Sequence, residues 1–409
     1  MNTVSRVIRN TGFLYMKMGV TMFVSLYATR LILNALGVDD FGIFNMVAGV
    51  IAMLAFLNAS MAAATQRFMS YAEGEGDPEK QKIVFNISVV LHLAIAVMVG
   101  ILLYAAAPIL FGHVLNIPED RVFAARCVYW AMIASTVFGI LGVPCEAVLN
   151  AHENMLYFAV IGVLESFLKL GAALLVVHVL ADKLILYGVL MAGISILAMT
   201  AMLVYCRRNY AECVIAPRRY WKRGVFREMG SFAGWNFTVS ASSMLSEYGV
   251  GIVLNHFFGV ALNAAQAVAQ QINGQTMAFS GTMLKALNPV ISKSEGAGNR
   301  GLMLRASLSG CKFAYLLMAV FAIPLILEAP GLLGLWLHSV PAWAVLFCRL
   351  QLARTLLEQL FLSLGAAIYA EGNIRLYTLV KTGSGILFLG ATWGFYRMGW
   401  PPCMMYVAA

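Results

Sequence analysis

Charged side chains are scarce in this sequence. Asp, Glu, Lys and Arg make up 11% of the 409 residues, whereas apolar residues make up 61% and the mean hydropathy is +0.80. A soluble domain carries about 25% charged and about 45–50% apolar residues. Because no protein core could remove so much apolar surface from water, the excess must face lipid, where only helices or closed barrels satisfy the backbone. The composition predicts an all-α polytopic membrane protein and excludes a soluble globular one.

Cysteine motifs are also absent. No CxxC pair and no Cys/His ligand spacing occurs, so neither a disulfide framework nor a zinc or haem site is indicated, and we expect no metal and no cofactor. We interpret the cysteines as small apolar packing residues. They are Cys127, Cys145, Cys206, Cys213, Cys311, Cys348 and Cys403.

A cleavable signal sequence is not predicted either. Lys17 and Arg30 interrupt the first apolar stretch, and no small-residue cleavage site follows it. We therefore expect this stretch to remain in the protein as its first membrane-spanning helix.

What the sequence does contain is a series of long apolar segments. A helix needs about 20 mostly apolar residues to cross a bilayer. We predict spans near 11–35, 41–64, 83–112, 122–146, 155–181, 184–206, 230–256, 261–289, 303–327, 342–368 and 374–397. After Trp400 a twelfth helix begins, but its nine residues cover only about 13 Å, so we expect this helix to be truncated. The predicted organisation is a six-helix lobe over 1–206, a basic connector over 207–229 and an incomplete lobe over 230–409.

Basic residues are distributed unevenly between the predicted loops. Fifteen Lys and Arg fall on the side of the N-terminus, whereas the other side holds only Arg121, Lys183 and Arg397. Loops in the cytoplasm carry the excess of positive charge. The N-terminus is therefore predicted to be cytoplasmic.

The two predicted lobes share an internal repeat. The loop Ser70-Tyr-Ala-Glu-Gly-Glu-Gly-Asp77 corresponds to Ser292-Lys-Ser-Glu-Gly-Ala-Gly-Asn299 at an offset of 222 residues, and the same offset relates Gly37 to Gly259. An even number of helices per repeat gives both halves the same orientation. We therefore predict two parallel six-helix repeats that form two lobes around a central cavity.

Two motifs carry a resemblance to a known superfamily. They are Tyr27-Ala-Thr-Arg-Leu-Ile-Leu-Asn-Ala-Leu-Gly37-Val-Asp-Asp-Phe-Gly42 and Gln66-Arg67-Phe68, and the repeat extends the likeness over the chain. The sequence resembles the multidrug/oligosaccharidyl-lipid/polysaccharide exporter superfamily, and within it the bacterial polysaccharide (lipid-linked oligosaccharide) flippases. The resemblance implies a two-lobed transporter in the bacterial cytoplasmic membrane. Its substrate would be a polyprenyl-pyrophosphate-linked oligosaccharide for surface polysaccharides such as lipopolysaccharide.

The resemblance transfers no functional residue, because the family has no short catalytic signature. The multidrug branch typically has an acidic residue and a proline in its first helix, and residues 11–35 contain neither. A cation-coupled (Na+ or H+) multidrug antiporter remains the alternative function. An enzyme is not expected, since the predicted outer connections are short and the longest, 328–341, is largely apolar.

Charged residues inside the spans are the candidate site residues. A charge at mid-bilayer costs about 2.5–3.5 kcal/mol and such residues usually face an aqueous cavity. An excess of cations suits a pyrophosphate head group. The candidate substrate-binding cations are Lys17, Arg30, Lys169, Lys285, Arg349, Arg354 and Lys381, and the candidate ion-coupling acids are Glu165, Glu247 and Glu358.

Each candidate has a structural alternative. Glu165 with Lys169, and Arg354 with Glu358, stand at i,i+4 and can neutralise one another on one helix face. Arg30 and Lys285 lie near span ends and can extend to the interface.

A polar stripe follows one face of the eighth span at 3–4-residue spacing: Asn263, Gln266, Gln270 and Asn273. We interpret the last three as a cavity wall for sugar hydroxyls, and hydrogen bonding between helices is the alternative.

The connector contains Arg218-Arg219-Tyr220-Trp221-Lys222-Arg223. Basic and aromatic residues together are typical of a membrane interface, so we expect anionic lipids as partners. Nucleic acid is not expected. Membrane proteins of polysaccharide assembly are further candidate partners.

Overall fold

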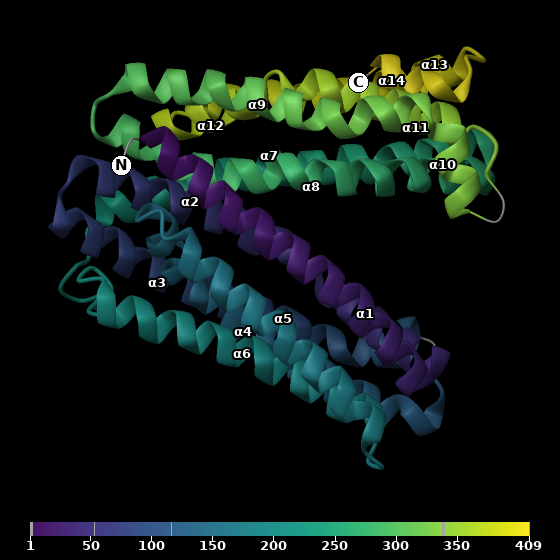
Figure 1. Cartoon of the computed structure of the whole chain (residues 1–409), viewed down its shortest axis with the longest axis horizontal. Helices are drawn as coiled ribbons and strands as arrows, with labels where there is room; N and C mark the ends of the chain where they lie inside the picture. The colour runs from purple at the N-terminus through teal and green to yellow at the C-terminus, as the bar shows by residue number, and fades with distance from the viewer. Residues whose placement is uncertain (1–2, 53, 116, 338–339, 409) are drawn as a thin grey trace. The chain divides into compact units, whose positions relative to one another are not determined.

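The computed structural model describes residues 3–52, 54–115, 117–337 and 340–408, and these residues contain helices and loops but no strand (Figure 1). The prediction of an all-α protein is confirmed. The chain divides into two compact units, Met1–Ala233 and Gly234–Ala409, so that the change of unit falls inside helix α7. Each unit is described by itself.

Unit 1 is built from long helices that pack lengthwise. Helix α1 packs against α5, α4 packs against α2, α3 and α6, and the beginning of α7 completes the unit (Figure 1). Tyr129 is fully buried between α3 and α4, where its hydroxyl donates to the Leu103 carbonyl at 2.6 Å. The helices are α1 (Thr3–Ala52), α2 (Ala55–Glu75), α3 (Pro78–Ile109), α4 (Val122–Ala151), α5 (Met155–His178), α6 (Lys183–Asn209) and α7 (Arg223–Phe258).

Unit 2 holds the rest of α7 and the helices that follow. Helix α8 packs against α9, α11 and α12, and Phe347 of α11 is fully buried in its core. The helices are α8 (Val260–Gly296), α9 (Arg300–Leu327), α10 (Ala329–Trp336), α11 (Ala344–Gln359), α12 (Leu362–Glu371), α13 (Arg375–Arg397) and α14 (Met405–Ala408).

The glycines of the internal repeat adopt matching backbone conformations. Gly37 has φ 79° and ψ 174°, and Gly259, 222 residues later, has φ 81° and ψ −177°. Gly76 and Gly298, which have the same offset, have φ of 69° and 71°. Positive φ is strained for residues with a side chain, so glycine is required at these turns. The two halves therefore share local geometry as well as sequence.

The residues after the second pair of glycines also correspond. Asp77 accepts hydrogen bonds from the backbone amides of Glu79 and Lys80 at the start of α3. Asn299 accepts one from the Leu302 amide at the start of α9. Both side chains cap the first turn of a helix, where backbone amides lack partners.

The structure corrects three predicted boundaries. The predicted span 41–64 is divided between α1, which ends at Ala52, and α2, which begins at Ala55. The predicted span 342–368 is broken at Leu360-Phe361, where the Phe361 amide donates to the Glu358 carbonyl, a three-residue turn. The predicted outer connection 328–341 contains helix α10. Residue 53 of the second predicted span, residues 338–339 of that connection and residue 409 at the predicted twelfth helix lie outside the described residues.

Among the described residues, seven helices are long and apolar enough to cross a membrane, fewer than the eleven predicted spans. They are α1, α3, α4, α5, α6, α7 and α9. Residues 342–368 are divided between two short helices, and α8 carries the polar stripe. The predicted span count is therefore not reached by length and hydropathy alone.

Candidate functional site

Lys17 of α1 lies against α5 inside unit 1. Its Nζ atom is 3.8 Å from the centre of the Phe158 ring, a distance at which the ring face attracts a cation. Gly162 lies one turn further along α5, and a Cβ atom there would be 2.1 Å from the lysine Cε. The bare glycine backbone therefore provides the room that the lysine side chain occupies.

Further polar side chains lie near this lysine on the same helices. Ser166 of α5 donates to Thr21 of α1 at 3.1 Å. The carboxylate of Glu165 is 2.7 Å from Lys169 Nζ and 3.5 Å from the hydroxyl of Ser195 in α6. The structure thus forms one of the two i,i+4 ion pairs that the spacing indicated. Helices α1, α5 and α6 together carry a polar cluster in unit 1.

In unit 2 the polar stripe of α8 meets α11. Asn273 accepts a hydrogen bond of 2.7 Å from the buried hydroxyl of Thr355, so this member of the stripe joins two helices. Gln266 is buried, whereas Gln270 is partly exposed. At Asn273 the stripe therefore forms a hydrogen bond between helices, which was the alternative to a cavity wall.

The two arginines of α11 have defined contacts. Arg354 forms an ion pair of 2.9 Å with Glu358, the second i,i+4 pair. Arg349 donates to the carbonyls of Ile326 and Leu327 at 2.9 and 3.3 Å. The last carbonyls of a helix lack partners within it, so Arg349 satisfies the end of α9.

The remaining candidates lie on α1, α7, α8 and α13 and differ in exposure. The side chains of Arg30 in α1, Glu247 in α7 and Lys381 in α13 are exposed, and Lys285 in α8 is partly exposed. Lys381 Nζ lies 5.9 Å from the ring centre of Tyr377.

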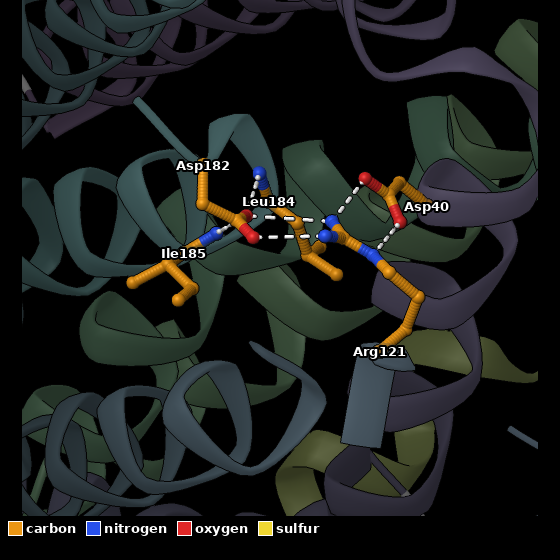
Figure 2. Close-up of polar contacts among 5 residues, drawn as sticks. All are labelled: Asp40, Arg121, Asp182, Leu184 and Ile185. Carbon is orange, nitrogen blue, oxygen red and sulfur yellow. Dashed lines mark hydrogen bonds and ion pairs between the residues drawn. The ribbon is translucent and has the colours of Figure 1, made fainter. Parts of the chain in front are cut away.

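A further polar cluster, also in unit 1, was not predicted from the sequence. Arg121, just before α4, donates to Asp40 of α1 through Nε at 2.8 Å and to Asp182 through Nη1 at 2.8 Å (Figure 2). Asp182 also accepts hydrogen bonds from the amides of Leu184 and Ile185 at the first turn of α6 (Figure 2). One arginine therefore joins the starts of α4 and α6 to the interior of α1.

The environment of Asp182 shifts its pKa. Burial by itself would raise the pKa of the carboxyl, but the amide of Ile185 and the guanidinium of Arg121 stabilise the charged form more strongly. The pKa of Asp182 therefore lies below its ordinary value of 3.8. Only the scarcity of cations on this side of the chain could have drawn attention to Arg121 in the sequence.

No arrangement of His, Cys, Asp and Glu suited to a metal ion occurs in the described part of the chain, and all seven cysteines are free.

The fold is that of a known class of transporters. An outward-facing multidrug resistance MATE family transporter of the MOP superfamily matches 98% of this chain and 91% of its own, with a TM-score of 0.81 and 14% identity. A MATE in the bent conformation matches 98% and 92%, with a TM-score of 0.83 and 16% identity. A MOP superfamily transporter from Pyrococcus furiosus matches 98% and 91%, with a TM-score of 0.80 and 14% identity. No curated protein is significantly similar to the sequence.

Together with a family-model match over residues 7–295, this fold identifies a multi-pass membrane transporter of the multidrug/oligosaccharidyl-lipid/polysaccharide exporter superfamily, as the sequence motifs indicated. The family model described as "Polysaccharide biosynthesis protein" matches residues 7–295. The chain belongs to this polysaccharide biosynthesis family.

Proposed function

We propose that this transporter flips a polyprenyl-pyrophosphate-linked oligosaccharide across the bacterial cytoplasmic membrane, for the synthesis of cell-surface polysaccharide. The observation that carries the proposal is the family match over residues 7–295, which covers unit 1 from residue 7 onward and the start of unit 2. With its N-terminus in the cytoplasm, the protein delivers the substrate to the outer leaflet.

The proposed mechanism follows from the charges within the spans. Lys17 and Lys381 attract the pyrophosphate, because ammonium groups bind phosphate oxygens strongly where water is excluded. Gln270, which is partly exposed, donates and accepts hydrogen bonds with sugar hydroxyls. The polyprenyl chain stays in lipid while the transporter alternates access to the two sides of the membrane. Na+ or H+ coupling would supply the driving force.

The ion pairs in the structure favour this function over a cation-coupled multidrug antiporter. A coupling site needs an acid that can exchange its partner, and an i,i+4 ion pair already gives the carboxylate a partner on its own helix. Glu165 lies beside Lys169 and Glu358 beside Arg354. Among the three candidate acids, Glu247 alone has no Lys or Arg at i±4, where Ser243 and Gly251 stand. The antiporter alternative therefore depends on Glu247.

The test is a strain deleted for the gene of this chain, in which lipid-linked oligosaccharide is quantified separately in the two leaflets of the inner membrane. We expect build-up in the cytoplasmic leaflet, reversed by complementation, because synthesis continues while transport stops. Mass analysis of the accumulated lipid would identify the sugar. Normal distribution of the lipid, together with altered cation-dependent dye retention, would reject the flippase and support the antiporter.

A further inference from the structure

The segment between α6 and α7 is fastened to unit 1 by its backbone. Asn86 of α3 is 1% exposed. Its side-chain amide donates to the Val214 carbonyl at 2.9 Å and accepts from the Ala216 amide at 2.7 Å. This pair of bonds holds residues 214–216 against α3, as a neighbouring strand would.

A second set of contacts holds the beginning of the same segment. Glu212 is buried and lies 2.5 Å from Nε2 of His152, which follows the end of α4. The imidazole ring stacks on Tyr210 with 4.4 Å between ring centres, and Asn154 donates to the Tyr210 hydroxyl at 3.0 Å. Residues 210–216 therefore have a defined position on unit 1.

The segment held in this way, together with the neighbouring ends of α6 and α7, forms a basic surface over residues 207–227, which we name the connector surface. All seven of its cations are exposed: Arg207, Arg208, Arg218, Arg219, Lys222, Arg223 and Arg227. Within the described part of the chain, none of them forms an ion pair with a carboxylate, although Glu228 follows directly. Glu212 is paired with His152 and buried. The connector surface is thus strongly cationic without internal compensation.

Large apolar side chains accompany these cations. Val214, Ile215 and Trp221 are 48%, 49% and 44% exposed. Tyr220 is buried, with Arg219 lying over its ring at 5.4 Å. Exposed tryptophan and aliphatic residues beside arginines suit the boundary between head groups and acyl chains, because each part meets its preferred medium there. A soluble acidic protein would not require apolar side chains of this kind.

We propose that the connector surface binds the head groups of anionic phospholipids in the leaflet that it faces. The arginines and Lys222 contact the phosphates, and Trp221, Val214 and Ile215 enter the interface. A single basic residue near an anionic membrane is worth up to about a fivefold preference for the charged lipid. This binding does not depend on the proposed transport function.

The experiment measures anionic lipid beside Trp221. The whole protein is reconstituted in phosphatidylcholine bilayers that contain a small fraction of brominated phosphatidylglycerol or, separately, brominated phosphatidylcholine. Bromine quenches nearby tryptophan, and the signal of Trp221 is the difference from a Trp221→Phe variant. We expect phosphatidylglycerol to be enriched about fivefold at this site, and the enrichment to vanish in 1 M salt, where the Debye length is about 3 Å.

Two charge variants make the test specific. Arg218→Gln/Arg219→Gln/Lys222→Gln removes three of the cations near Trp221, and we expect the enrichment to fall well below that of the unaltered protein. Arg305→Gln/Arg375→Gln/Arg397→Gln removes three exposed cations elsewhere and should retain it. Equal enrichment in both variants, or enrichment that persists in 1 M salt, would overturn the proposal. The salt comparison uses the unaltered protein, so it holds even if the first variant does not fold.

Discussion

A lysine within a membrane-spanning helix needs compensation for its charge. Insertion at the helix centre costs about 2.5–3.5 kcal/mol. In unit 1 the aromatic face of Phe158 contacts Lys17 Nζ, and Gly162 leaves the space for its stem. The absence of a side chain at Gly162 therefore leaves the room in which this cation lies.

The Gly162→Ala substitution tests this arrangement. A methyl group there would displace the end of the lysine, which is flexible, so we expect a small effect on stability; alanine itself favours a helix by about 0.5–1 kcal/mol. Transport of the oligosaccharide should fall about fivefold, as for the loss of about 1 kcal/mol of interaction. The measurements are thermal unfolding in detergent and the distribution of the lipid between leaflets.

Gly171→Ala on the same helix is the matched control, because no atom lies within 4 Å of its added Cβ. It gains the same helix propensity and should transport normally. If both variants transport normally, or if Gly162→Ala reduces transport in a protein already carrying Lys17→Ala, then the glycine does not act through the lysine.

At the level of helices, Arg121 forms contacts between segments that are far apart in the sequence, which no single helix could make. It binds Asp40 in α1 and Asp182 before α6 (Figure 2). Asp182 therefore has two separable roles: it caps the first turn of α6, and it pairs with the arginine. Asparagine retains the capping oxygen but loses the charge.

We expect Asp182→Asn to lower the melting temperature at pH 7 by about 1–2 °C, for the loss of up to about 1 kcal/mol from a partly exposed ion pair. The folded-state pKa of Asp182 is below its ordinary value of 3.8. Its contribution to stability is therefore present above that value and is lost as the pH falls through the lower, folded-state pKa. The variant and the unaltered protein should converge in melting temperature at such acidic pH.

Asp77→Asn is the control for the cap alone. Asp77 caps α3 through the amides of Glu79 and Lys80, with no arginine among its hydrogen-bond partners in the described structure. We expect this variant to melt within about 1 °C of the unaltered protein at pH 7. An equal loss of stability in both variants, at every pH, would mean that the Arg121 pair contributes nothing.

The helices show what sequence reasoning can reach. Apolar length located most spans, and spacing indicated the pairs Glu165–Lys169 and Arg354–Glu358, because both signals are local. The break at Leu360-Phe361 was missed, since neither residue is a helix breaker. The Arg121 cluster was missed because its acids lie 81 and 61 residues away along the chain. Such contacts depend on packing between helices, which a single sequence does not record.

For the whole molecule, the repeat connects sequence to architecture. Gly37 and Gly259 share an unusual backbone conformation, as do Gly76 and Gly298. The polar side chains of α8 do not repeat in this way: its stripe of Asn and Gln corresponds to Phe41, Phe44, Ala48 and Ile51 in the first half. Scaffold residues are thus shared between the halves, whereas the residues proposed to contact substrate differ, as a ligand without internal symmetry would require.

The candidate substrate-binding cations of the two units can be tested in one variant. Lys17→Gln/Lys381→Gln removes one candidate cation from each unit; Arg349 is left in place because it satisfies the carbonyls that end α9. We expect oligosaccharide on the outer leaflet to fall at least about tenfold, because each lost ammonium–phosphate contact costs about 1 kcal/mol or more. Leaflet-resolved lipid analysis in the complemented deletion strain measures this.

Arg375→Gln/Arg397→Gln provides the matched loss of two exposed cations that are not candidates for the site. It should support normal export, since a general change in net charge does not alter a local phosphate contact. The antiporter alternative makes a different prediction: Glu247→Gln would abolish activity, and the lysine double variant would have no effect on export. Because the two functions require opposite charges at the site, this set of variants separates them within one strain.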